Sequence, residues 1–232
     1  MLHVEGLNKH FGGVHAVRYC SLHIESGSIN GLIGPHGAGK TTLFNMIAGE
    51  LRPTSGRILF CGEDVAGLLT YQVFHRGIVR IFQIPHEFAK MTVLENLMVV
   101  PPAPPVEHIF NNWLAPSSER KREREVHDRA RDALEFLSIS HLRDERAGNL
   151  SGGQKKLLEL GRTMMTDAML VLLDEPGAGV KPTLLVKIRE MIASLCNPVI
   201  VLSEGCVLAQ GEMAQVRRNP QVLEAYLGGA ES

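Results

Sequence analysis

The sequence predicts an α/β fold with a mostly parallel sheet in its core, an N-terminal antiparallel β subdomain and an inserted helical subdomain. Three observations predict it. Strand-like segments separated by glycine and serine fill the first 33 residues. Two short apolar runs, INGLI and LVLL, end directly in glycine-rich or acidic motifs. From about Pro85 to Asn149 the pattern becomes helical. We therefore expect a core of residues 1–84 and 150–232 within a single domain, and a helical subdomain of residues 85–149.

The N-terminal elements follow from local patterning. MLHVEGL, VRYCSLHIESG and INGLIG are expected to be strands. A helix should then run from Lys40 to about Gly49, because apolar side chains recur at helical spacing and the glycine can end it. The stretch RPTSGRILFCGEDV predicts a loop and another strand.

The middle block is expected to contain the helix MTVLENLMVV, the stiff loop PPAPP and the charged helix SSERKREREVHDRARDALEFL. In the charged helix, acidic residues interleave with basic ones at helical pair spacings. An apolar inner face is marked by Val126, Ala130, Ala133, Leu134 and Leu137. This pattern favours a solvated helix face over a nucleic-acid-binding patch.

Composition narrows the class. The chain has 232 residues, a formal net charge of −1 and a pI of about 6.8, so no strong field attracts it to nucleic acid. No apolar run is long enough to span a membrane, and the N-terminus lacks the layout of a signal peptide. Cys20, Cys61, Cys196 and Cys206 form no C-x-x-C pair, which favours buried thiols in a reducing cytosol over a zinc or redox site.

The stretch GPHGAGKTT, residues 34–42, satisfies the phosphate-binding pattern G-x-x-x-x-G-K-[ST] between a strand and a helix. Glycines allow backbone N–H groups to converge on phosphate oxygens, and the following helix adds its positive end. Lys40 would neutralise the β- and γ-phosphates, and Thr41 would offer a hydroxyl to Mg²⁺. This predicts a P-loop NTPase core.

The stretch LVLLDEP, residues 170–176, reads as a buried parallel strand that ends in two carboxylates. Asp174 would hold Mg²⁺, and Glu175 would act as the general base on the attacking water. Adjacent buried carboxylates without a cation are costly, which itself indicates a metal nearby.

A third motif, LSGGQKK at residues 150–156, begins with Ser151 as a helix N-cap and creates a second anion-binding helix start. The three motifs, in this order, resemble the ATP-binding subunit of ABC transporters over essentially the whole chain. In that family two such domains dimerise head-to-tail around two ATP. The resemblance identifies Phe11 as the aromatic residue that stacks on adenine. It identifies Gln83 as a catalytic and metal-contacting glutamine that couples to the membrane subunits.

The resemblance thus implies catalytic roles for Lys40, Gln83 and Glu175, and metal contacts for Thr41, Gln83 and Asp174. The implied ATP-binding residues are Phe11, Gly34, Pro35, His36, Gly37, Ala38, Gly39, Lys40, Thr41, Thr42, Ser151, Gly152, Gly153 and Gln154.

A narrower resemblance concerns the transported solute. Four segments resemble the branched-chain amino-acid subfamily of importers: FGGVHAV, VRIFQ, MTVLENLMV and NPQVLEAYLGGA. Urea-type subunits share these sequence motifs. The implied partners are integral-membrane permeases, a second ATPase subunit in a homo- or heterodimer and, indirectly, a solute-binding protein, without nucleic acid. The implied location is the cytoplasmic face of the inner membrane, as a peripheral subunit.

The sequence departs from the family at three places. His36 replaces the usual asparagine, either as a neutral loop substitution or as a tuning residue, and Lys181 replaces an acidic or amide residue of the dimer-contact loop. Between MIASL and CNPVIVLSEG about twenty residues of the family pattern are missing, including a core strand, a helix and the switch histidine. We therefore expect the strand PVIVL to pair where the lost strand lay, or a gap in the sheet. We also expect ATP binding with weak or no intrinsic hydrolysis.

Other classes remain as alternatives. A non-hydrolysing nucleotide-binding assembly subunit, or a degenerate paralogue, would keep the same motifs. A soluble ABC protein of repair or translation is disfavoured, because those carry tandem domains, coiled-coil insertions or zinc hooks. A small-molecule kinase is disfavoured by LSGGQ, which kinases do not need.

Overall fold

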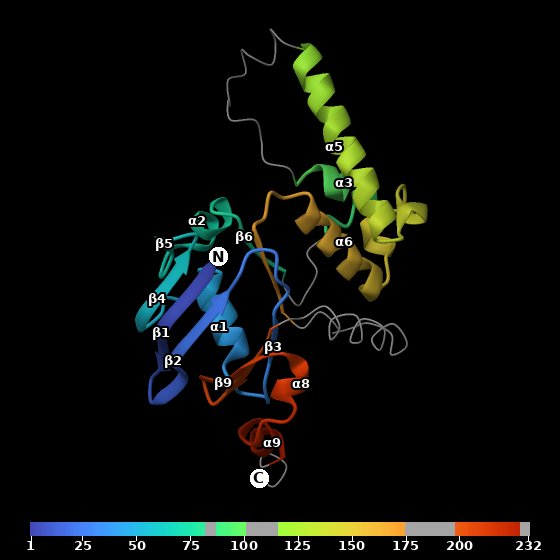
Figure 1. Cartoon of the computed structure of the whole chain (residues 1–232). Helices are drawn as coiled ribbons and strands as arrows, with labels where there is room; N and C mark the ends of the chain where they lie inside the picture. The colour runs from blue at the N-terminus through green and yellow to red at the C-terminus, as the bar shows by residue number, and fades with distance from the viewer. Residues whose placement is uncertain (82–86, 101–115, 175–197, 228–232) are drawn as a thin grey trace. The chain divides into compact units, whose positions relative to one another are not determined.

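The computed structural model describes residues 1–81, 87–100, 116–174 and 198–227 (Figure 1). Contacts divide the chain into two compact units, one of residues 1–78 with 182–232 and one of residues 79–181. Gln83, Glu175, Lys181 and Cys196 lie outside the described residues.

The first unit contains the predicted antiparallel sheet, in the order β2-β1-β4-β5. Its strands are β1 (Leu2–Phe11), β2 (Val14–Ile24), β4 (Ser55–Phe60) and β5 (Glu63–Asp64). The central strand β1 pairs antiparallel with both β2 and β4. Leu2, Val4 and Leu7 of β1 are buried, as expected for a sheet with one face packed on a core.

A second sheet of the same unit has the order β3-β8-β9, with β3 (Gly31–Ile33), β8 (Val199–Ser203) and β9 (Cys206–Gly211). The strands β3 and β8 run parallel, and β9 returns antiparallel to β8. Val199 and Val201 of β8 are buried against Val216 of α8 (Met213–Val216) and Val222 of α9 (Pro220–Leu227). The predicted strand PVIVL is therefore present and pairs with the strand that precedes the P-loop.

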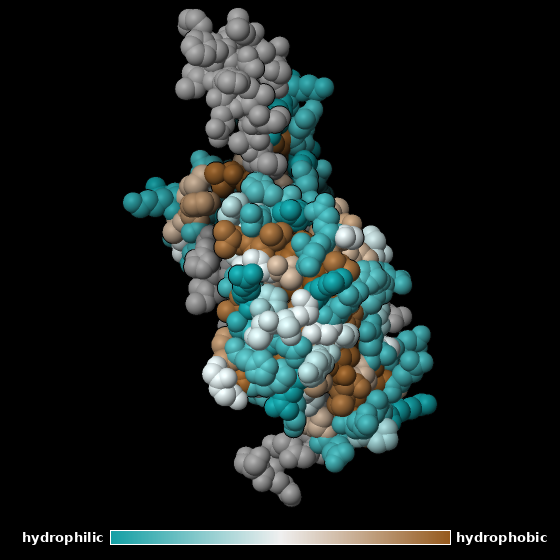
Figure 2. Space-filling view, turned by 90° about the vertical axis from the view of Figure 1, so that its left-hand side faces the viewer, coloured by the Kyte–Doolittle hydropathy of each residue, from teal (hydrophilic) through white to brown (hydrophobic). Residues whose placement is uncertain are grey.

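Helix α1 (Lys40–Ile47) begins after Gly39, and Ala48 is its C-cap, so the prediction of a helix from Lys40 to about Gly49 is confirmed. The short helix α2 (Thr70–His75) follows β5. On the face shown in Figure 2, apolar patches interrupt the hydrophilic surface. The exposed large apolar side chains of this unit include Leu69, Tyr71 and Phe74, in and beside α2.

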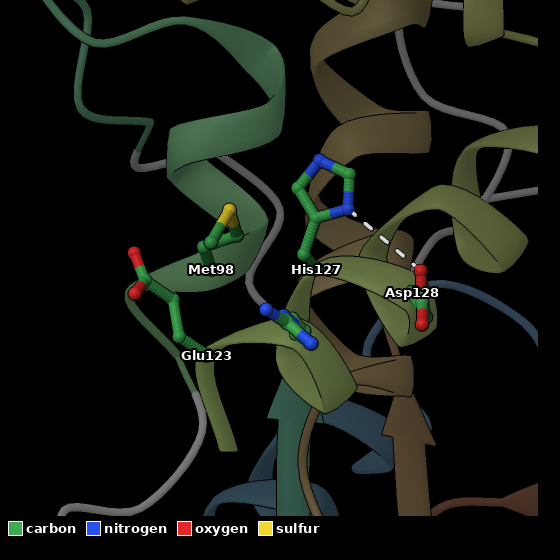
Figure 3. Close-up of a pocket in the computed structure, with 5 residues that line it drawn as sticks. Met98, Glu123, His127 and Asp128 are labelled. Atoms are coloured by element: carbon green, nitrogen blue, oxygen red, sulfur yellow. Dashed lines mark ion pairs between the residues drawn. The ribbon is translucent and has the colours of Figure 1, made fainter. Parts of the chain in front are cut away.

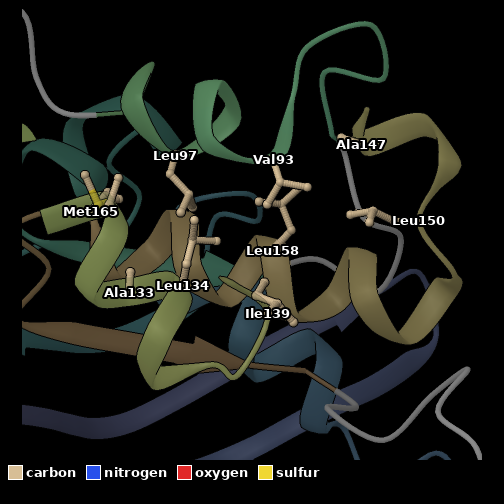
Figure 4. Packing of buried hydrophobic residues seen from close by; sticks show 10 residues of the cluster. Val93, Leu97, Ala133, Leu134, Ile139, Ala147, Leu150, Leu158 and Met165 are labelled. Atoms are coloured by element: carbon tan, nitrogen blue, oxygen red, sulfur yellow. The ribbon is translucent and has the colours of Figure 1, made fainter. Parts of the chain in front are cut away.

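The second unit packs three helices around one apolar cluster: α3 (Val93–Met98), α5 (Pro116–Phe136) and α6 (Gly152–Met164). Figure 4 shows Leu97, Leu134 and Leu158 meeting between them, all fully buried. The two short 3-10 turns Ser140–Leu142 and Ala147–Asn149 join α5 to α6. The inner face predicted for the charged helix is confirmed, because Ala130, Ala133 and Leu134 are buried and Val126 and Leu137 pack against the cluster.

Strand β6 (Ile78–Ile81) pairs with β7 (Leu170–Leu173) in a separate two-stranded sheet. The expectation that all four residues of β7 are buried is wrong. Leu170 and Leu172 are buried, whereas Val171 and Leu173 are 38% and 42% exposed. Successive side chains of a strand point to opposite faces, so β7 has one buried and one accessible face. Among the described strands, no pairing joins the β3 sheet to the β7 sheet.

The expectation of buried thiols is confirmed for Cys20 and wrong for Cys61 and Cys206, which are exposed at strand ends. No helix in the described ranges is long and apolar enough to cross a membrane. Helix α6 and strand β7 belong to the same compact unit as α3 and α5. The functional boundaries at residues 85 and 149 remain a prediction.

Candidate functional site

The glycine-rich loop between β3 and α1 is closed by its own lysine. The Lys40 Nζ donates hydrogen bonds to the backbone carbonyl oxygens of Gly34 and Pro35, both at 2.8 Å. His36 and Gly37 at the tip are exposed, and Ala38 is buried. The amine is therefore held over the loop, where it can exchange carbonyl oxygens for phosphate oxygens.

The loop is anchored to its surroundings by backbone contacts. The Gly205 N–H donates to the Ala38 carbonyl at 3.1 Å, and the Gly205 carbonyl accepts from the Arg18 N–H at 2.8 Å. A Cβ added at Gly39 would lie 2.5 Å from the Ala16 carbonyl oxygen, and one at Gly205 would lie 2.7 Å from it. No side chain fits there without moving backbone, so the turn after β8 supports the loop. The supporting role of this turn was not predicted from the sequence, although Gly205 was a recognisable sign of a tight turn.

Two other predicted residues of the first unit are accessible. Phe11 ends β1 and is 46% exposed, and the Lys9 Nζ lies 5.1 Å from the centre of its ring. An exposed aromatic ring can stack on a planar base. Thr41, in the first turn of α1, has an exposed side chain, and Thr42 is half-buried.

The motif LSGGQ begins α6. Ser151 Oγ accepts from the Gln154 N–H at 3.4 Å, and Gln154 Oε1 accepts from the Ser151 N–H at 2.8 Å. This capping box starts the helix at Gly152, which confirms the predicted N-cap role of Ser151. Ser151 and Gly152 are exposed, so the start of α6 is accessible at these two residues. Next to them, the Lys155 Nζ contacts Glu87 Oε1 at 2.6 Å.

Asp174 follows β7 and forms an ion pair that the sequence did not predict. Its Oδ2 lies 3.0 Å from Arg80 Nη2 on the neighbouring strand β6. The side chains are 15% and 9% exposed, respectively. The signal was present, because an arginine inside the apolar run IVRI needs a partner.

The predicted site residues thus fall into two groups. Phe11 and the P-loop residues 34–42 lie in the first unit, whereas Ser151, Gly152, Gly153, Gln154 and Asp174 lie in the second. Gln83 and Glu175 lie outside the described residues. Within the first unit, an amine and backbone N–H groups suit phosphate and the Thr41 hydroxyl suits a hard cation; within the second, the Asp174 carboxylate also suits a hard cation.

A separate hollow of about 380 Å³ lies between α3 and α5 (Figure 3). It is lined by Met98, Glu123, Arg124, His127 and Asp128. The His127 Nδ1 and Asp128 Oδ1 lie 3.9 Å apart. None of the predicted site residues lines this hollow.

Known families and proteins match the chain over nearly its full length. The ABC transporter family profile matches residues 17–178, and the profile of the branched-chain amino acid ATP-binding cassette transporter matches residues 206–232. A probable branched-chain amino acid transport ATP-binding protein of Archaeoglobus fulgidus is 38% identical, with 100% of this chain and 97% of the relative covered. The high-affinity branched-chain amino acid transport ATP-binding protein BraF of Pseudomonas aeruginosa is 36% identical, with coverages of 99% and 98%.

Solved ATP-binding cassettes share the fold. A nucleotide-free cassette from an ABC transporter superposes with a TM-score of 0.76 at 34% identity, covering 98% of this chain and 99% of that chain. A cassette in its ADP conformation gives a TM-score of 0.78 at 34% identity, covering 98% of both. The alignment with the Archaeoglobus protein places the 232 residues in 256 positions, so at least 24 positions (256 minus 232) have no residue in this chain.

Proposed function

The chain belongs to the ABC transporter family, in the group of branched-chain amino acid ATP-binding cassettes, and on this basis we propose that it is the ATP-binding subunit of a branched-chain amino acid importer. The observation that carries the proposal is the closed P-loop, with Lys40 poised over Gly34 and Pro35, in a chain similar to transport ATP-binding proteins along its whole length.

Each described site residue has a proposed task. Phe11 stacks on the adenine, and the N–H groups of residues 34–42 with Lys40 bind the phosphates. Thr41 and Asp174 hold the metal, with Gln83 as a further contact. Mg²⁺, when bound, neutralises charge on the β- and γ-phosphates. Ser151, Gly152, Gly153 and Gln154 grip the γ-phosphate of a nucleotide held by a second ATPase subunit, arranged head-to-tail.

The partners follow from this role. ATP-binding subunits of ABC importers dimerise and pair with membrane permeases, and the proposed location is the cytoplasmic face of the inner membrane. A solute-binding protein would act on the opposite side. Branched-chain amino acids are the proposed solutes. Urea is the alternative, because urea-type subunits share the same sequence motifs.

Hydrolysis is proposed to be slow in the isolated chain. The 24 or more alignment positions without a residue support a deletion, and the chain has no histidine after His141. Glu175 remains as general base, but no switch histidine would align the γ-phosphate and the attacking water. The lack of a histidine after His141 also favours the second candidate, a non-hydrolysing nucleotide-binding assembly subunit or a degenerate paralogue.

Nucleotide binding and transport test the function separately. Isothermal titration with MgATP should show binding that Lys40→Ala weakens by at least a hundredfold, about 2.7 kcal/mol. Membrane vesicles containing the two permeases, the second ATPase and this chain should take up labelled leucine, and vesicles with the Lys40→Ala variant should not. Failure of the unmodified chain to bind ATP would refute the proposal. Uptake of urea without leucine would reassign the solute.

A further inference from the structure

The carboxylate assigned to the metal already holds a cation of this chain. We propose that Arg80 is a positioning residue that occupies Asp174 when no nucleotide is bound, so that Asp174 exchanges Arg80 for the metal when the magnesium nucleotide arrives. The inference rests on the proposed function, which assigns Asp174 to the metal. The observation that carries it is the 3.0 Å contact between Arg80 Nη2 and Asp174 Oδ2 across β6 and β7.

The contact between Arg80 and Asp174 is energetically important because both side chains are largely buried. A carboxylate that is only 15% exposed has lost most of its contact with water, so a cation at contact distance stabilises it. A guanidinium remains charged at every accessible pH and matches carboxylate geometry. Arg80, itself 9% exposed, therefore holds the Asp174 carboxylate in a fixed position through this direct contact.

The same pair opposes binding of the metal alone. The Oδ2 atom that accepts from Arg80 has a lone pair engaged, and a divalent cation at Asp174 would sit within a few ångströms of a fixed positive charge. In a site shielded from water this repulsion is only partly screened. Asp174 should therefore respond weakly to a free divalent cation and strongly to one that arrives neutralised by phosphates.

A purely structural ion pair makes a different prediction. Such a pair would join β6 to β7, and its removal would lower stability without raising affinity for a cation. Binding of a metal to the nucleotide-free protein separates the two roles, because it needs neither hydrolysis nor transport.

The test uses the full chain without nucleotide, with Mn²⁺ as the probe and free Mn²⁺ measured by electron paramagnetic resonance. Arg80→Gln should bind Mn²⁺ at least tenfold more tightly than the unmodified protein, which is 1.4 kcal/mol. The double variant Arg80→Gln with Asp174→Asn should lose that gain. The matched control is Arg76→Gln, which removes an exposed ion pair with Glu63 just before β6 and should leave Mn²⁺ affinity unchanged.

Affinity of Arg80→Gln within twofold of the unmodified protein would overturn the proposal. If that variant does not fold, Asp174→Asn decides the question. Because Arg80 already holds the carboxylate, this change should alter nucleotide-free Mn²⁺ affinity by less than twofold while weakening MgATP at least tenfold. A tenfold loss of nucleotide-free Mn²⁺ affinity would show that Asp174 was open to the metal. Loss of ATP binding in the unmodified chain would instead refute the proposed function.

Discussion

Replacing Gly205 by alanine tests the claim that the turn after β8 supports the P-loop. Gly205 has a φ of +81°, and its new Cβ would lie 2.7 Å from the Ala16 carbonyl oxygen and 2.9 Å from the Val17 Cα. The left-handed backbone costs an alanine about 1 kcal/mol. Pressing a methyl group against fixed backbone adds about 2 kcal/mol. We therefore expect the free energy of unfolding to fall by about 3 kcal/mol, measured by urea denaturation.

The chain offers a matched control at Gly62, where φ is +87° and an added Cβ meets nothing within 4 Å. Gly62→Ala should cost only the backbone term, about 1 kcal/mol. Since Gly205 also donates to Ala38 in the loop, Gly205→Ala should weaken ATP binding about tenfold, whereas Gly62→Ala should not. Equal stability losses in the two variants, or unchanged ATP affinity in Gly205→Ala, would refute the reasoning.

Three further predictions concern the remaining elements. Leu158→Ala empties a fully buried position between α3, α5 and α6 and should cost about 3 kcal/mol in urea denaturation; a loss below 1 kcal/mol would contradict the packing. Ser151→Ala and Thr92→Ala each remove a capping-box acceptor and should each cost about 1 kcal/mol, but only Ser151→Ala should weaken ATP-dependent dimerisation in analytical ultracentrifugation. Burial, with a smaller contribution from a neighbouring cysteine, raises the pKa of the Cys20 thiol from 9.0 to about 12. The stability contributed by the protonated thiol is therefore complete below pH 9 and is lost as the pH rises towards 12. Cys20→Ala should flatten that alkaline decline, and at pH 8 a thiol reagent should modify Cys61 in the folded protein but not Cys20.

Much of the fold was predictable, because local patterns determined it. Glycines and alternating apolar residues marked the N-terminal strands, and helical spacing marked α1 and the inner face of α5. The start of α6 was also predictable, because Ser151 is a favoured N-cap residue and Gln154, three positions later, completes a capping box with it. The burial of β7 was overestimated, because the sequence of a strand does not reveal which of its faces a neighbouring layer covers.

The residues of the site were likewise only partly predictable from the sequence. Phosphate-binding residues follow a contiguous pattern, so residues 34–42 were identifiable from sequence. The supporting residues Gly205 and Arg80 were not, because each acts through a contact between residues far apart in the chain. Only the geometry joins Gly205 to the P-loop and Arg80 to Asp174.

Phosphate release under multiple-turnover conditions tests the central claim most directly. The purified chain, with saturating MgATP and a fluorescent phosphate sensor, should bind nucleotide yet release less than one phosphate per protein over the period in which a competent cassette completes many turnovers. The Glu175→Gln variant should behave the same way. Steady multiple turnover by the unmodified chain, abolished by Glu175→Gln, would contradict the account and show that this cassette hydrolyses ATP without a switch histidine.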